Sequence, residues 1–124
     1  MGKNEVSYSM PLDKIAAKIA ALGVPGLIFA TAMAATGLVG AAAITAALAA
    51  LGPGGMIGGI ALLGVAGLIS DAFIQYGADA VISAVIKELY LNGETKESLK
   101  QKIQTYWVSK ELKLKLCDMI DHFA

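Results

Sequence analysis

The stretch that decides the fold runs from Ile19 to Ser70 and reads IAALGVPGLIFATAMAATGLVGAAAITAALAALGPGGMIGGIALLGVAGLIS. None of its 52 residues carries an ionisable side chain; Lys18 precedes it and Asp71 follows it. Because a bilayer-spanning helix needs about 20 apolar residues, the stretch is long enough for two such helices. The segment Leu51-Gly52-Pro53-Gly54-Gly55 would separate them, since proline removes a backbone donor and glycine favours turns. The stretch therefore predicts a membrane-inserting helical hairpin.

The composition agrees with a membrane location and argues against nucleic acid. Of the 124 residues, 56% are hydrophobic with glycine left out of the count; soluble chains reach about 45–50% with glycine included. The ten basic residues are all lysine and balance ten acidic residues, so no excess of positive charge is available to neutralise phosphates. One domain is expected at this length. Its composition divides it into residues 1–22, 23–91 and 92–124.

The first division, residues 1–22, is a polar start followed by an amphipathic helix over residues 10–22. Ser9 could cap this helix, and Pro11 is tolerable in its first turn. Its apolar residues follow a helical spacing: Leu12, Ile15, Ala16, Ile19 and Leu22. Lys14 and Lys18 share the opposite face with Asp13. We expect the helix to lie at a membrane interface with its lysines directed towards headgroups; the alternative is an ordinary amphipathic helix on a soluble core.

The second division, residues 23–91, begins with the two hydrophobic helices, one from Gly26 to Leu51 and one from near Met56. At about 1.5 Å per residue the first would reach roughly 39 Å, more than the ~30 Å of hydrocarbon, so it would tilt. Small residues recur along both at spacings that let helix backbones approach closely. The predicted helix-packing residues are Ala30, Ala34, Gly37, Ala41, Gly54, Gly55, Gly58 and Gly59. These faces predict a homo-oligomer.

After Ser70 a polar stripe appears on a helix that is predicted to continue to Asn92-Gly93. The stripe recurs at every fourth residue and consists of Asp71, Gln75, Asp79, Ser83 and Lys87. On one helix Asp71 and Asp79 would lie about 12 Å apart on the same side. In an oligomer the stripe could line a cation path; the alternative is a stripe that faces bulk water at the membrane surface.

The third division, residues 92–124, is a polar helical pair. Thr95 can cap a helix over residues 96–106, and Ser109 can cap a last helix to the C-terminus, with Trp107 at the bend between them. Seven of the ten lysines lie from Lys87 onward. The positive-inside rule therefore predicts a cytoplasmic C-terminus, and a two-span hairpin places the N-terminus on the same side.

Residues for chemistry are scarce. With one histidine and one cysteine, the sequence offers no Ser-His-Asp, Cys-His or zinc-ligand spacing, and Cys117 cannot form an intrachain disulfide. Asp118 and His122 stand one helical turn apart near the C-terminus, too few ligands for a metal site. The glycines of residues 52–59 lack the lysine and Ser/Thr of a phosphate loop. We expect neither an enzyme nor a cofactor, and no small-molecule substrate.

Two segments resemble a known family. They are Thr36-Gly37-Leu38-Val39-Gly40-Ala41-Ala42-Ala43-Ile44 and Gly54-Gly55-Met56-Ile57-Gly58-Gly59-Ile60. Together they are similar to the glycine/alanine-rich core of the interferon-inducible small membrane protein family of the 6-16 type. The resemblance implies a small intracellular-membrane protein linked to cell death or antiviral defence, without catalytic residues.

The sequence therefore predicts an all-α protein with a membrane-inserting hairpin, flanking amphipathic helices and a C-terminal helix pair. The predicted function is a self-associating membrane protein that permeabilises or remodels a bilayer, as a pore-forming effector, toxin or holin-like subunit. The alternative is a structural subunit of a filament, ring or shell, packed through Gly/Ala helix faces. A variant of the first keeps the apolar hairpin inside a soluble helical core until it is triggered.

Overall fold

The computed structural model describes residues 11–37, 40–51, 59–106 and 108–123. Within these ranges the chain forms seven helices and no strand, so the predicted all-α class is confirmed. The helices are α2 (Leu12–Ala20), α3 (Val24–Thr36), α4 (Gly40–Leu51), α5 (Gly59–Tyr76), α6 (Ala78–Leu91), α7 (Lys96–Gln104) and α8 (Lys110–His122).

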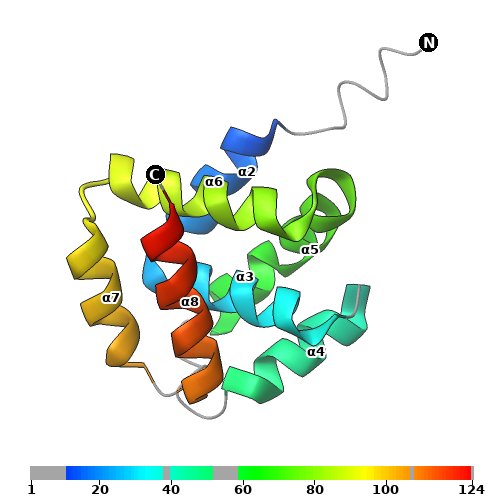
Figure 1. Ribbon diagram of the computed structural model, residues 1–124. Helices are drawn as coiled ribbons and strands as arrows, with labels where there is room; N and C mark the ends of the chain where they lie inside the picture. Colours follow the sequence, from blue (N-terminus) through cyan, green and yellow to red (C-terminus); the bar gives the residue numbers. More distant parts are fainter. Residues whose placement is uncertain (1–10, 38–39, 52–58, 107, 124) are drawn as a thin grey trace.

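Helix α3 lies at the centre of the arrangement, and each of the other six described helices contacts it. In Figure 1 the C-terminal pair, α7 and α8, stands to the left of α3, while α6 runs above it and α4 extends at the lower right. Helix α2 packs chiefly on α6 and α5. The apolar core thus forms around α3 and includes buried residues from each of the other described helices.

Helix α2 is amphipathic, as its spacing predicts, but its apolar face is covered by protein. Ile15, Ala16 and Ile19 are buried, whereas Lys14 and Lys18 are exposed. The helix starts after Pro11, which takes the cap position and not the first turn; Ser9 lies outside the described residues. In this fold α2 therefore packs its apolar face on other helices, and its placement at a membrane interface remains a prediction.

The predicted continuous helix from Gly26 to Leu51 is wrong. Helix α3 ends at Thr36, Gly37 adopts a left-handed backbone with φ of 69°, and α4 begins at Gly40. The physical reason is that the break lets α4 fold back against α3, whereas a straight rod of this length would leave more of its apolar surface uncovered. The predicted start near Met56 lies outside the described residues.

The helix continues past Ser70 as predicted, but the prediction that it runs unbroken to Asn92-Gly93 is wrong. Helix α5 ends at Tyr76, and Gly77, with φ of 90°, separates it from α6. This turn folds α6 back so that Val81, Ile82 and the other buried residues of its inner face reach the core. The predicted end at Asn92 is confirmed, because Asn92 is the C-terminal cap of α6.

The C-terminal pair folds as its local signals predict. The Thr95 hydroxyl accepts from the Ser98 N–H at 3.0 Å, and the Ser98 hydroxyl accepts from the Thr95 N–H at 2.8 Å, which forms a reciprocal cap at the start of α7. The Ser109 hydroxyl accepts from the Leu112 N–H at 3.2 Å at the start of α8. Trp107 lies outside the described residues.

Candidate functional site

The central feature of the molecule is the uncharged helix α3. Nine of its thirteen residues are buried: Val24, Gly26, Leu27, Ile28, Phe29, Ala30, Thr31, Ala32 and Met33. The single buried hydroxyl among them is satisfied locally, because Thr31 Oγ1 donates to the Leu27 carbonyl at 2.9 Å. The buried Thr31 hydroxyl is therefore satisfied within α3 itself.

Its burial accounts for much of the stability of the fold. Val24, Leu27, Ile28, Phe29 and Met33 are each at most 3% exposed. Burying each such side chain contributes about 1.5–3 kcal/mol, so the five together contribute on the order of 10 kcal/mol. That is comparable with the whole net stability of a domain, about 5–15 kcal/mol. In water α3 must remain buried to keep this stabilisation. In an apolar solvent an exposed α3 would lose none of it, because its side chains would still be out of water.

The C-terminal pair covers one side of α3 with apolar residues and carries its charges outwards. The buried residues of the pair are Leu99, Ile103, Leu112, Leu116 and Ile120. An ion pair between Lys100 and Asp121 joins α7 to α8, and one between Lys102 and Glu94 closes the turn before α7. Exposed ion pairs contribute about 0–1 kcal/mol each. Apolar contacts, more than charges, therefore hold this cover in place.

The ion pairs lower the pKa values of their acidic groups. Hydrogen bonds, first from Lys102 and then from the Ser98 hydroxyl, hold the pKa of Glu94 below its usual value. The hydrogen bond from Lys100 lowers the pKa of Asp121 in the same way. Both carboxylates therefore lose a favourable contact when they are protonated in acid.

A cleft of about 440 Å³ lies between α6 and α8. Its polar lining comes from Asp79 and Ser83 on α6 and from Asp118 and His122 on α8. The hydrogen bond of His122 Nδ1 to the Asp118 carbonyl, at 2.8 Å, together with the Asp118 charge, raises the pKa of His122. No group of three or more His, Cys, Asp or Glu side chains that could hold a metal ion occurs within the described ranges.

The junction between α3 and α4 depends on two glycines with left-handed backbone. Gly37 has φ of 69° and Gly40 has φ of 64°, and a Cβ added at either position would meet no atom within 4 Å. Space is therefore not the constraint; the backbone angle is, because a residue with a Cβ pays about 1–2 kcal/mol there. The Gly40 N–H donates to the buried Ser70 hydroxyl at 3.1 Å, which ties the start of α4 to α5.

Ser70 and Gly26 hold helices together in the fold, and the sequence interpretation missed both. A serine in an apolar helix must find a partner when it is buried, and that requirement is the signal that could have singled out Ser70. Gly26 is the close-approach point between α2 and α3, since a Cβ there would lie 2.3 Å from the Ile19 carbonyl oxygen. Only a three-dimensional contact reveals this role.

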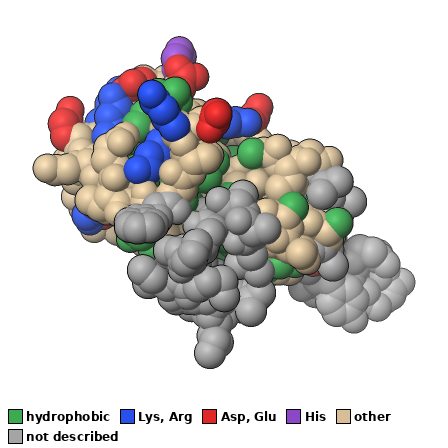
Figure 2. Space-filling view, turned by 90° about the horizontal axis from the view of Figure 1, so that it is seen from below, with side chains coloured by type: hydrophobic (Ala, Val, Ile, Leu, Met, Phe, Trp, Pro, Cys, Tyr) green, Lys and Arg blue, Asp and Glu red, His purple; other side chains and the backbone are tan. Residues whose placement is uncertain are grey.

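We call residues 40–51 and 59–70, which form α4 and the first part of α5, the uncharged arm. Among its described positions Ala42, Thr45, Gly64 and Gly67 are exposed. Figure 2 shows charged side chains gathered at one end of the molecule, and almost none among the coloured residues at the other. A helix surface that faces water is normally polar, whereas these four exposed positions carry only alanine, threonine and glycine.

The predicted pore-lining residues do not form one stripe in this fold. Asp71 and Gln75 lie on α5, and Asp79, Ser83 and Lys87 lie on α6, on either side of the turn at Gly77. All five side chains are exposed. The distance of about 12 Å along one helix, expected for the two aspartates, therefore does not apply here.

The predicted packing residues are likewise divided. Ala30 is buried within α3, Ala34 is half-buried, Gly37 is the exposed residue that ends α3, and Ala41 belongs to α4, so the four do not share one helix face. Gly54, Gly55 and Gly58 lie outside the described residues, and Gly59 is the first residue of α5.

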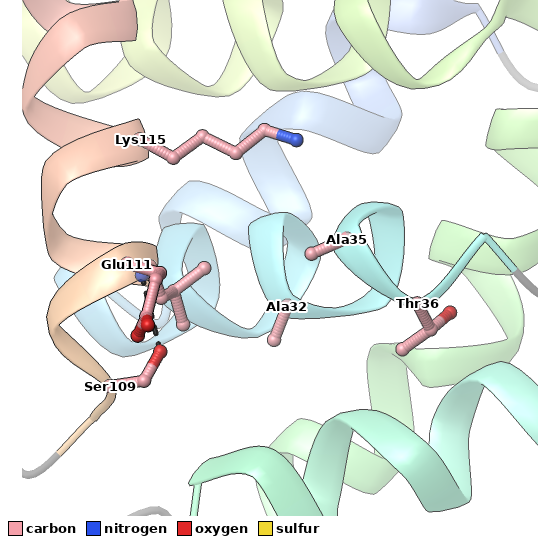
Figure 3. A pocket seen from close by; sticks show the side chains of 7 residues that line it. Ala32, Ala35, Thr36, Ser109, Glu111 and Lys115 are labelled. Carbon is pink, nitrogen blue, oxygen red and sulfur yellow. Dashed lines mark hydrogen bonds between the residues drawn. The ribbon is translucent and has the colours of Figure 1, made fainter.

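A smaller cavity of about 280 Å³ lies between the end of α3 and the start of α8. Figure 3 shows Ala32, Ala35 and Thr36 of α3 opposite Ser109, Glu111 and Lys115 of α8. The cavity places the polar beginning of α8 beside the junction between α3 and α4.

None of the described helices alone has the length and apolar character needed to cross a bilayer; α2 and α3 meet that requirement only together, across a bend of 119°. No protein-family model, curated protein or solved structure matches this chain. The resemblance noted in its Gly/Ala-rich segments remains a prediction.

Proposed function

We propose that this chain is a self-associating membrane protein that permeabilises or remodels a bilayer, and that the packed fold is its stored form. The observation that carries the proposal is α3, an uncharged helix buried beneath amphipathic helices and continued by the uncharged arm. A helix that only fills a protein core does not need a second uncharged segment after it. An apolar arm that remains partly exposed requires a further apolar environment.

Insertion would begin by straightening the junction between α3 and α4. Helix α3, with 13 residues, reaches only about 20 Å, which is too short for a hydrocarbon core of ~30 Å. Joined with α4 it would form one helix over residues 24–51, about 42 Å long at 1.5 Å per residue. Such a helix spans a bilayer with tilt. Straightening therefore converts two short helices into one spanning helix.

Straightening at Gly77 would have a second consequence. A continuous helix over residues 59–91 restores the spacing of four between Asp71, Gln75, Asp79, Ser83 and Lys87. In an oligomer this stripe would face an aqueous path, because carboxylates at membrane depth face water or a partner. The two long helices form the hairpin predicted from the sequence, with both termini on the cytoplasmic side.

Vesicle leakage tests the proposed function. We expect release of a trapped dye from vesicles by the full chain, in proportion to bound protein. Replacing both carboxylates, Asp71→Ala with Asp79→Ala, should reduce the preference for cations without abolishing release, because the variant keeps the apolar helices. Intact vesicles at saturating bound protein would refute the function, and unchanged selectivity would refute the role of the stripe.

Lipid contact of the uncharged arm provides a second measurement. In a Cys117→Ser background a fluorophore at Ala42→Cys, an exposed position on α4, should be quenched by nitroxide-labelled acyl chains when vesicles are added. The matched control is Gln101→Cys, an exposed position on α7, which should remain unquenched. Equal quenching at both positions would contradict insertion of the arm.

A structural subunit is the second candidate function. It is favoured by the exposed glycines of the arm, Gly64 and Gly67, where the backbone of a second copy could approach closely. An assembly of this kind should sediment intact in buffer without detergent. A chain that disperses in buffer and associates only with vesicles would exclude this function in favour of the first.

A further inference from the structure

The charges of α8 are distributed unevenly along the helix. Residues 109–115 contain three lysines and one glutamate, a net charge of +2, whereas residues 116–124 contain two aspartates and one neutral histidine, a net charge of −2. This polarity opposes the helix dipole, which favours acidic groups at the start and basic groups at the end. The lysines therefore do not serve the stability of α8 itself.

A large apolar side chain lies among these lysines. Leu114 is 62% exposed and follows Lys110 and Lys113, with Lys115 next to it. Lys110 and Lys115 are exposed, and Lys113 is half-buried with its ammonium donating to the Gln104 carbonyl at 3.1 Å. An exposed leucine surrounded by cations has the composition of a surface that meets anionic headgroups with lysines and acyl chains with leucine.

The position of this surface matters for insertion. Lys115 lines the cavity between α3 and α8 together with Ala35 and Thr36, the last residues before the glycine junction (Figure 3). Contact at the start of α8 thus brings a bilayer to the end of α3 where straightening has to begin.

We propose that Lys110, Lys113, Lys115 and Leu114 form a docking surface for the headgroups of an anionic bilayer. This inference rests on the proposed membrane activity and adds the lipid class and the site of first contact. Each lysine at a negatively charged surface contributes about a fivefold increase in binding, and the three together roughly a hundredfold. The exposed Glu111 opposes them with one negative charge. Leucine insertion adds about tenfold.

The test is co-sedimentation with vesicles of phosphatidylcholine alone and of phosphatidylcholine mixed with phosphatidylglycerol. The triple variant Lys110→Gln, Lys113→Gln, Lys115→Gln should lose roughly a hundredfold in binding to the mixed vesicles. Its matched control removes the same charge elsewhere, at the exposed Lys14, Lys18 and Lys102. This control should bind like the native chain, and circular dichroism should show that both variants are folded.

Equal losses in the two triple variants would mean that net charge alone decides binding, and would overturn the proposal. A larger loss in the Lys14, Lys18 and Lys102 variant would place the docking surface on α2 and α7 and would overturn it too. Leu114→Ser should weaken vesicle binding about tenfold and leave binding to an oligonucleotide unchanged. Tight oligonucleotide binding without vesicle binding would assign the lysines to a polyanion.

The outcome is separable from that of the proposed function. Binding to anionic vesicles without dye release would support the docking surface and refute permeabilisation. Dye release from phosphatidylcholine vesicles that is equal for the native chain and the α8 variant, with equal binding to mixed vesicles, would support permeabilisation and refute the docking surface.

Discussion

Alanine at Gly37 or Gly40 should make the folded protein less stable and, at the same time, more active on membranes. Both glycines have positive φ in the packed fold, and both have open space around the missing Cβ. Alanine at a left-handed position costs about 1–2 kcal/mol, so each substitution should lower the free energy of unfolding by that amount. No steric clash contributes, because nothing lies within 4 Å.

In the straightened helix the sign of the effect reverses. Both positions become helix interior, where alanine is more favourable than glycine by about 0.5–1 kcal/mol. The substitution destabilises the bent form and stabilises the straight form, so each shifts the equilibrium between them by roughly 1.5–3 kcal/mol, or about 10- to 150-fold. Half-maximal dye release should occur at a correspondingly lower concentration of the Gly37→Ala or Gly40→Ala variant, measured beside urea unfolding.

Two glycine variants provide matched controls. Gly93→Ala introduces the same left-handed strain, at φ of 104°, in the turn between α6 and α7, away from the apolar helices. It should lower stability equally without increasing dye release. Gly64→Ala lies within α5 in open space and should increase stability slightly. If Gly93→Ala increases release as much as Gly37→Ala does, general destabilisation explains the effect and the straightening model fails.

Four further predictions concern the stored fold. Gly26→Ala should lower the free energy of unfolding by about 1–3 kcal/mol, because its Cβ would collide with the Ile19 carbonyl; urea titration measures this, and native-like stability would contradict the contact. Thr95→Ala should lower it by about 1 kcal/mol through loss of the cap, whereas Thr95→Ser should retain most of it. The lowered pKa of Glu94 gives stability that is present above its ordinary value of 4.5 and lost as the pH falls through the lower folded value, so Glu94→Gln should flatten the acid limb of the stability curve. The raised pKa of His122 affects stability in the opposite direction. Its contribution to the free energy of unfolding is fully present below pH 6.5 and is lost as the pH rises through the folded pKa. An NMR titration that finds no upward shift of this pKa would refute the prediction.

The elements with local signals could be predicted from the sequence. Thr95 and Ser109 cap α7 and α8 as expected, and the apolar spacing of α2 identifies its buried face. In these segments the caps and the 3.6-residue period act within a few residues of the chain, so no knowledge of the tertiary structure is needed.

The breaks at Gly37 and Gly77 could not be predicted in the same way. Glycine inside an apolar run is compatible with a continuous helix in lipid, where backbone groups must bond internally, and with a turn in water. The choice depends on the solvent, which the sequence does not state. The polar stripe depended on the same choice, because its fourfold spacing forms one face only if Gly77 is helical.

Which apolar helix forms the core was, in contrast, predictable from side-chain size. Helices α3 and α4 both lack charge, but α3 carries Leu27, Ile28, Phe29 and Met33, whereas α4 is mostly alanine. Burial free energy scales with apolar area, so the segment with the large side chains gains most from the interior. Attention to charge alone treats the two segments as equivalent and misses this difference.

The proposed function places the driving force for opening in the solvent, with no ligand required. In water the breaks are favourable because they allow α3 to be covered, and backbone N–H and C=O groups that a helix end leaves without a helical partner can bond to water. In hydrocarbon each such unsatisfied group costs several kcal/mol, while the burial that held α3 inside contributes nothing further, since lipid is equally apolar. Both changes favour one long helix, so a bilayer that reaches the junction at Gly37 and Gly40 would straighten it. By the same reasoning, detergent micelles should increase the helical content of the native chain. The increase should be smaller in Gly37→Ala, because its junction already favours the helix. An equal increase in both proteins would contradict the idea that the solvent straightens the junction.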